Sequence, residues 1–140
     1  MKRKTIVSLL LALPFFLKAA VVVTHPRTEQ LVNPLGLDTH AQRMSWMLES
    51  DAKNVMQTAY HILVASSPEL LAEGKGDLWD SGLVPSGESQ WIVYKGKKLK
   101  SNQRGWWKVK TYTTQGESDW SEPATWGIGS LKEANRSGRW

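Results

Sequence analysis

The 140 residues are 41% hydrophobic and 22% charged, which fits one globular domain and excludes both a disordered tail and a pair of ordinary domains. Four of the 18 basic side chains lie in the first twenty residues, and the remaining 14 basic and 13 acidic side chains do not indicate a nucleic-acid partner. The absence of cysteine excludes disulfides, thiolate metal sites and cysteine nucleophiles.

Residues 1–20 have the organisation of a signal peptide. A basic start, MKRK, is followed by an apolar run of about thirteen residues and then by Ala19 and Ala20. The run is shorter than the roughly 20 residues that a membrane-spanning helix needs. We therefore expect a signal-peptide helix, cleavage near Ala20 and export to the periplasm or the extracellular space. Because Lys18 lies three positions before that cut, an uncleaved membrane anchor is the alternative.

After residue 20 the chain is first polar and then alternates apolar and polar side chains. Residues 21–33 are expected to form an extended entry segment, since the chain is polar there and Pro26 interrupts it. Residues 43–50 alternate apolar and polar side chains with the period of a half-buried strand, and Trp46 falls on the apolar phase. Residues 57–67 repeat the pattern and end in two serines, and two phases are open for the core face: Tyr60, Ile62 and Val64, or Ala59, His61 and Leu63.

One short helix and several further strands complete the prediction. Ser67 is suited to cap a helical turn that Gly74 would end. Residues 89–96 and 104–116 carry the two strongest strand signals. In the second, Trp107, Val109 and Thr111 share the inner face, and the outer face holds Trp106, Lys108, Lys110 and Tyr112. On the outer face, the cations are expected to lie across Trp106. A final strand is expected over residues 121–129, SEPATWGIG.

These strands recur every ten to fifteen residues with turn signals between them and little helical periodicity. The sequence therefore predicts an all-β fold, an antiparallel seven-stranded immunoglobulin-like β-sandwich over residues 34–129. It resembles a fibronectin type III domain in two places. Trp46 matches the tryptophan of the second strand, and the pattern that leads into the last strand is matched by Gly116, Ser118, Trp120, Ser121 and Pro123.

A closer resemblance covers Leu31 to Gly129. The elements NPLG, MSW, QTAYHILVASS, LWDSG, VYKGKKLKS, WKVK and WSEPATW occur in this order. The segment is similar to the N-terminal immunoglobulin-like module of bacterial α-L-rhamnosidases of glycoside hydrolase family 78. It departs from the family at Gly105 and Trp106, where a cysteine or small residue and then tyrosine are usual, and at Thr111, where valine is usual.

The resemblance implies a noncatalytic module, because the family carries its catalytic acids on a later (α/α)₆ barrel that has no counterpart here. Residues 130–140 are interpreted as a truncated linker tail, and a truncated gene, a split reading frame and a solitary module remain open. The implied role is packing against the downstream rhamnosidase domains and shaping access to the rhamnoside cleft. The alternative is a stand-alone carbohydrate-binding module that recognises a rhamnose-containing polysaccharide.

The sequence offers few residues for catalysis. Glu117, Asp119 and Glu122 form the densest acidic group, but on a turn between strands we expect them to be solvated and not a pair of glycosidase carboxylates. The three histidines are spaced too irregularly for a metal motif: His25, His40 and His61. We predict no catalytic residue, no metal site and no cofactor.

Tryptophans are the candidate site residues instead. Alternation places four in the core: Trp46, Trp79, Trp107 and Trp126. Three others are candidates for exposure, as a sugar platform, as a domain interface or in cation–aromatic stacks: Trp91, Trp106 and Trp120. The expected partners are therefore downstream rhamnosidase domains or a polysaccharide, with no nucleic acid, and a membrane only through an uncleaved signal segment.

Overall fold

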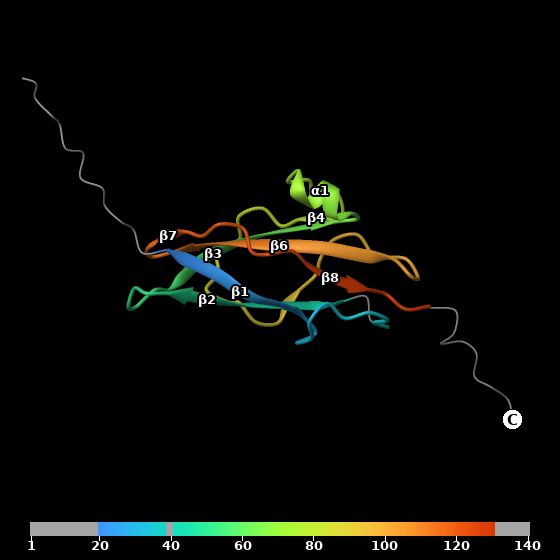
Figure 1. Ribbon diagram of the computed structural model, residues 1–140, viewed down its shortest axis with the longest axis horizontal. Helices are drawn as coiled ribbons and strands as arrows, with labels where there is room; N and C mark the ends of the chain where they lie inside the picture. The colour runs from blue at the N-terminus through green and yellow to red at the C-terminus, as the bar shows by residue number, and fades with distance from the viewer. Residues whose placement is uncertain (1–19, 39–40, 131–140) are drawn as a thin grey trace, which may run out of the picture.

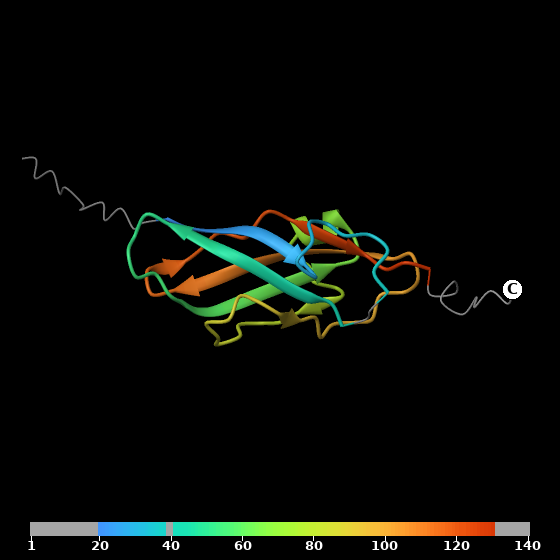
Figure 2. The same ribbon diagram turned by 90° about the horizontal axis from the view of Figure 1, so that it is seen from below.

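The computed structural model describes residues 20–38 and 41–130, and the predicted signal peptide up to residue 19 and the tail from residue 131 lie outside this part. The chain forms two facing antiparallel sheets (Figures 1 and 2). The smaller sheet has the order β1 (Val21–Thr28), β2 (Arg43–Ser50) and β5 (Ile92–Val93). The all-β antiparallel sandwich predicted from the sequence is confirmed.

The larger sheet is built around two long strands. It runs β4 (Trp79–Asp80), β3 (Gln57–Ala65), β6 (Arg104–Thr113) and β7 (Gly116–Glu117), and β8 (Ala124–Gly127) pairs with the other end of β6. The described residues contain eight strands, and seven of them, β2 to β8, lie within residues 34–129, where the sequence predicted seven. The additional strand is β1.

The structure differs from the prediction at the start of the domain, where residues 21–28 form strand β1 and not an extended entry segment. Val21 and Val23 are buried, and Val23 pairs with Leu48 of β2. Pro26 is compatible with the strand because the register shifts between Thr24 and Arg27, and a β-bulge at an edge strand accepts a residue that has no N–H to donate.

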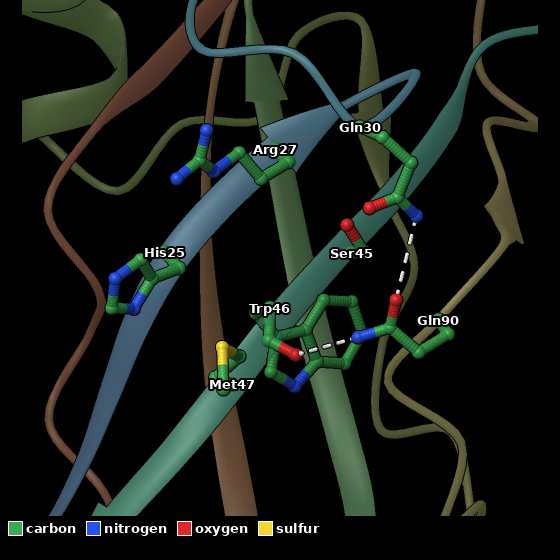
Figure 3. A pocket seen from close by; sticks show the side chains of 7 residues that line it. All are labelled: His25, Arg27, Gln30, Ser45, Trp46, Met47 and Gln90. Atoms are coloured by element: carbon green, nitrogen blue, oxygen red, sulfur yellow. Dashed lines mark hydrogen bonds between the residues drawn. The ribbon is translucent and has the colours of Figure 1, made fainter.

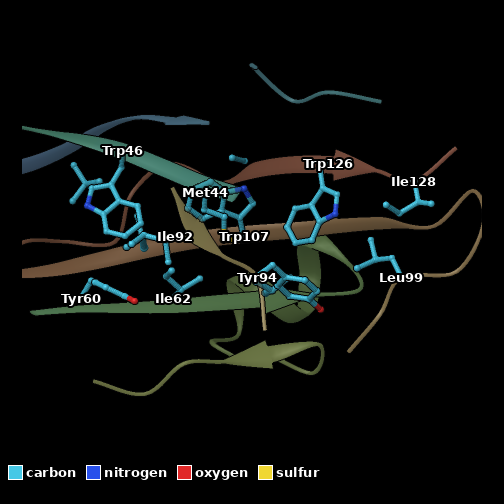
Figure 4. Close-up of a cluster of buried hydrophobic side chains, with 14 residues drawn as sticks. Met44, Trp46, Tyr60, Ile62, Ile92, Tyr94, Leu99, Trp107, Trp126 and Ile128 are labelled. Atoms are coloured by element: carbon cyan, nitrogen blue, oxygen red, sulfur yellow. The ribbon is translucent and has the colours of Figure 1, made fainter. Parts of the chain in front are cut away.

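Between the sheets lies an aromatic core (Figure 4). Trp46, Trp107 and Trp126 are fully buried in it, and Trp79 packs against it half-buried. Two of the indole N–H groups are paired: Trp46 Nε1 donates to Gln57 Oε1 at 3.0 Å, and Trp107 Nε1 donates to Thr28 Oγ1 at 3.2 Å. The Trp126 N–H has no hydrogen-bond partner within the described residues. All four tryptophans that alternation assigned to the core therefore contact it.

Strand β3 buries both of its faces, which explains why its pattern left two phases open. Tyr60, Ile62 and Val64 point into the main core. On the opposite face, Leu63 and Ala65 form a second small cluster with Leu71 of the short helix α1 (Pro68–Ala72). We call this the outer cluster. No helix in the described ranges is long and apolar enough to span a membrane.

Helix α1 begins and ends as its sequence predicts. The Ser67 hydroxyl accepts the Leu70 N–H at 3.2 Å, and Pro68 begins the helix. After the last turn, Gly74 takes a φ of +75°, and Gly74 and Lys75 donate to the carbonyls of Leu71 and Leu70 at 3.0 and 2.9 Å. This is a Schellman cap, in which glycine avoids the strain that a side chain would meet.

Candidate interaction site

The three candidate tryptophans lie on two different faces of the sandwich. Trp91 precedes β5 in the smaller sheet and is 53% exposed. Trp106, on β6, and Trp120, just before β8, are half-buried against the outer cluster on the larger sheet. The structure therefore brings Trp106 and Trp120 to one region and leaves Trp91 apart from them.

Trp91 is held in place by a charged pair. The Arg43 guanidinium lies 4.4 Å from the centroid of the indole ring. Glu29 in turn fixes Arg43, since its carboxylate accepts from Arg43 Nη2 at 2.8 Å, from Nε at 3.1 Å and from the backbone N–H at 2.7 Å. Hydrogen bonds from the Arg43 side chain hold the pKa of the Glu29 carboxyl below its ordinary value, against the opposing effect of partial burial.

The backbone of Trp91 is unusual as well. Its φ is +58°, a left-handed conformation that costs an L-residue roughly 1–2 kcal/mol. His25, Glu29 and Gln30 of the neighbouring β1 region also have positive φ values, of 51°, 52° and 63°. Of these, Glu29 binds Arg43 and therefore belongs to the same group of contacts as Trp91.

A polar groove of about 280 Å³ lies on the same face (Figure 3). Its rim includes two amides, with Gln30 Nε2 donating to Gln90 Oε1 at 3.4 Å and Gln90 Nε2 donating to the Trp46 carbonyl at 3.3 Å. Met47, Arg27 and His25 line the rest of it. A second groove, of about 340 Å³, has Trp91 itself in its lining beside Glu88 and Lys95. The first groove thus offers amide and guanidinium groups, and the second offers the Trp91 indole with two charged side chains, so that each can hydrogen-bond a polar ligand.

On the larger sheet, Lys108 Nζ lies 5.0 Å from the centroid of Trp120. The sequence predicted cations across Trp106, but both indoles pack against the outer cluster and Lys108 lies over Trp120. The His61 ring meets Trp120 edge-on at 5.2 Å, and its Nε2 lies 2.6 Å from Asp80 Oδ1. The pKa of Asp80 is lowered, first by the Gly82 N–H and then by His61, and burial lowers that of Lys108.

The acidic residues of GESDWSEP are exposed, as expected for a solvated turn: Glu117, Asp119 and Glu122. Glu117 pairs with Lys110 at 3.4 Å. Among the described residues, no three histidine, aspartate or glutamate side chains gather as a metal site would require.

One exposed surface was not identified from the sequence. Leu31, Val32 and Leu35 are 53%, 61% and 61% exposed, on the loop between β1 and β2. The sequence does carry a signal for this surface, because three large apolar side chains lie within five residues of an otherwise polar segment.

Comparison with known proteins shows where this sandwich occurs. A family model described as "Rha78A-like, N-terminal immunoglobulin domain" matches residues 23–132. An α-L-rhamnosidase of Formosa agariphila is 40% identical over 104 residues, which are 74% of this chain and 11% of that protein.

Two solved structures agree with this result. The α-L-rhamnosidase of Streptomyces avermitilis, in complex with L-rhamnose, has a TM-score of 0.75 and 40% identity over 80% of this chain and 11% of its own. The α-L-rhamnosidase from Dictyoglumus thermophilum has a TM-score of 0.78 and 36% identity over 85% of this chain and 13% of its own. The chain therefore spans about one eighth of these relatives. It belongs to the family of Rha78A-like N-terminal immunoglobulin domains, the N-terminal domain of α-L-rhamnosidases.

Proposed function

We propose that this domain is the noncatalytic N-terminal module of an exported bacterial α-L-rhamnosidase and that it acts by packing against the rest of that enzyme. The observation that carries the proposal is the family match, which covers residues 23–132 but only 11–13% of the matched rhamnosidases. The rhamnosidase chemistry is assigned to the remainder of the enzyme. The proposed contribution of this domain is surface complementarity, with an effect on access to the rhamnoside cleft. Export is supported by the signal-like composition of residues 1–20.

A transplanted domain tests the packing role. Residues 20–130 replace the matching N-terminal domain of the Streptomyces avermitilis enzyme, and the chimera is compared by calorimetry with that enzyme and with the isolated domain. If the domain packs as proposed, it unfolds together with the enzyme in one transition, because a large apolar interface couples the unfolding of the two units. A chimera in which the domain melts separately, at the temperature of the isolated domain, contradicts the proposal.

A second candidate function is saccharide binding. The observation that favours it is the exposed Trp91 indole, which stacks on Arg43 and lines an open groove of about 340 Å³. Tryptophan is common at binding sites because its ring buries a large apolar area while its N–H can donate a hydrogen bond. The expected ligand is a rhamnose-containing polysaccharide.

Tryptophan fluorescence during titration with such polysaccharides tests this second function. Binding is expected to shift or quench the emission, and Trp91→Ala is expected to abolish the response. Trp120→Ala is the matched control, since Trp120 is stacked on its own chain and should not contribute. No spectral change with any rhamnose-containing polymer, or an equal loss in both variants, contradicts a site at Trp91.

A further inference from the structure

Leu31, Val32 and Leu35 form a surface that we call the apolar loop. Their side chains are 53%, 61% and 61% exposed, and neither buried cluster of the described residues includes them. A single exposed leucine is ordinary on a protein surface, whereas three large apolar side chains within five residues are typical of a contact surface.

The backbone of the apolar loop is held firmly at both ends. Leu31 and Thr28 exchange two hydrogen bonds, of 2.9 and 3.1 Å. Further along, Asn33 Oδ1 accepts the Thr125 N–H at 3.0 Å, and the Pro34 carbonyl accepts the Gly127 N–H at 2.9 Å. The exposed leucine and valine side chains are thus not the result of a loose segment that can fold back over itself.

The loop also lies at the exit of the domain. After Pro34, Leu37 donates to the Gly127 carbonyl at 2.9 Å and accepts the Gly129 N–H at 2.9 Å, so the chain passes beside the loop as it leaves β8. Figures 1 and 2 show this loop next to β8 and the last described residues. In the matched rhamnosidases the N-terminal immunoglobulin domain accounts for 11–13% of the protein, so most of each enzyme lies beyond this exit.

The two aromatic surfaces each have a partner within the chain. Arg43 lies over one side of Trp91, which is otherwise 53% exposed, while Lys108 and His61 contact Trp120. The apolar loop differs because its three exposed side chains belong to neither buried cluster of the described residues. A domain attached a few residues away has a high effective concentration at this surface, which favours its docking there over that of a free partner.

From these observations we propose that the apolar loop is the docking surface for the domain that follows the immunoglobulin domain in an α-L-rhamnosidase. The inference rests on the proposed packing function and specifies its interface. The occupant is an apolar patch of that following domain, which covers Leu31, Val32 and Leu35. The Trp91 face stays open to solvent in this arrangement.

The test uses the chimera with the complete Streptomyces avermitilis enzyme. Val32→Asp with Leu35→Asp places two charges in the proposed contact. The matched control is Met56→Asp with Leu83→Asp, which changes side chains that are 67% and 60% exposed on other loops. In the isolated domain, both pairs are expected to leave the unfolding midpoint nearly unchanged, because surface substitutions away from special features have small effects.

In the chimera, the two pairs are expected to behave differently. The Val32/Leu35 pair should split the single calorimetric transition, so that the immunoglobulin domain melts at the temperature of the isolated domain, while the control pair keeps one transition. A single transition in the unaltered chimera that persists with the Val32/Leu35 pair overturns this inference and leaves the packing function intact. Two independent transitions in the unaltered chimera overturn the packing function itself. If the aspartates unfold the isolated domain, Val32→Ser with Leu35→Ser replaces them and is judged by the same outcomes.

Discussion

Ser121 and Val109 form a complete hydrogen-bonded pair although Ser121 lies outside any strand. The Ser121 N–H donates to the Val109 carbonyl at 2.8 Å, and its hydroxyl accepts the Val109 N–H at 3.1 Å. Three residues earlier, Ser118 makes the same two bonds to Thr111, at 2.8 and 3.0 Å. Each serine thus satisfies both backbone groups of one residue of β6. The segment GESDWSEP closes the edge of β6 by this means.

Replacing Ser121 with alanine is expected to destabilise the domain. The substitution leaves the buried N–H of Val109 without its acceptor, which costs about 1–3 kcal/mol. Urea unfolding of the two proteins measures the difference. Glu122→Ala is the control, since this neighbouring side chain is exposed and its loss should change stability by less than about 0.5 kcal/mol. Equal stability of Ser121→Ala and the unaltered chain would show that water or a backbone shift replaces the hydroxyl.

A contrast between two glycines tests the packing of Trp126. A Cβ at Gly105 would lie 3.1 Å from two ring atoms of Trp126, which is fully buried and cannot move aside. Gly105→Ala is therefore expected to cost about 1–3 kcal/mol through overpacking. A Cβ at Gly127 meets the end of the exposed Leu35 side chain, also at 3.1 Å, which can rotate away. We expect Gly127→Ala to be nearly neutral in thermal unfolding, and equal costs at both positions would contradict this explanation.

The Glu29–Arg43 pair predicts a specific acid dependence. Because the pKa of Glu29 is lowered in the folded state, its stabilisation is complete above its ordinary value of 4.5 and is lost as the pH falls through the lowered value. The stability difference between the unaltered chain and Glu29→Gln should therefore shrink on acidification below that value. Asp77 and Asp80 also have lowered pKa values, but they titrate in both proteins and cancel in the comparison. A difference that stays constant down to acid unfolding would contradict the prediction.

The raised pKa of Tyr94 predicts a loss of stability at alkaline pH. Its hydroxyl donates to the Lys97 carbonyl, and burial, with a further effect from the charge of Asp77, raises its pKa to about 12. The stabilisation by neutral Tyr94 is complete below its ordinary value of 10.0 and is lost as the pH rises through about 12. Burial also raises the pKa of Tyr60, so an ultraviolet titration should show late tyrosinate formation from both residues, and Tyr94→Phe should remove the part near pH 12. A titration curve that Tyr94→Phe leaves unchanged in that range, while the fold persists, would be the contrary result.

The long strands and the core tryptophans were predictable because their alternation is uninterrupted. In β6, Trp107, Val109 and Thr111 face inward as the period of two requires. Helix α1 was predictable from its end signals, Ser67 and Gly74, although it has only five residues. Where alternation or a helix end signal determines the local structure, the sequence alone was sufficient to predict it.

The remaining features depend on contacts between distant residues. Strand β1 was missed because its bulge places Pro26 and a left-handed His25 inside a strand, and only pairing with β2 reveals it. The apolar loop was missed because its position is set by hydrogen bonds to β8, about ninety residues later. Lys108 stacks on Trp120 and not on Trp106 because the segment that holds Trp120 pairs with β6 through Ser118 and Ser121.

The bonds that join Asn33 and Pro34 to β8 also affect how the domain is made. The loop after the first strand cannot settle until Thr125 and Gly127 are available, and the core is incomplete before Trp126 arrives. During synthesis, we therefore expect the earlier strands to reach their final packing only when nearly the whole domain has left the ribosome. The same bonds close the fold at its last strand, so the stability of the whole domain depends on β8.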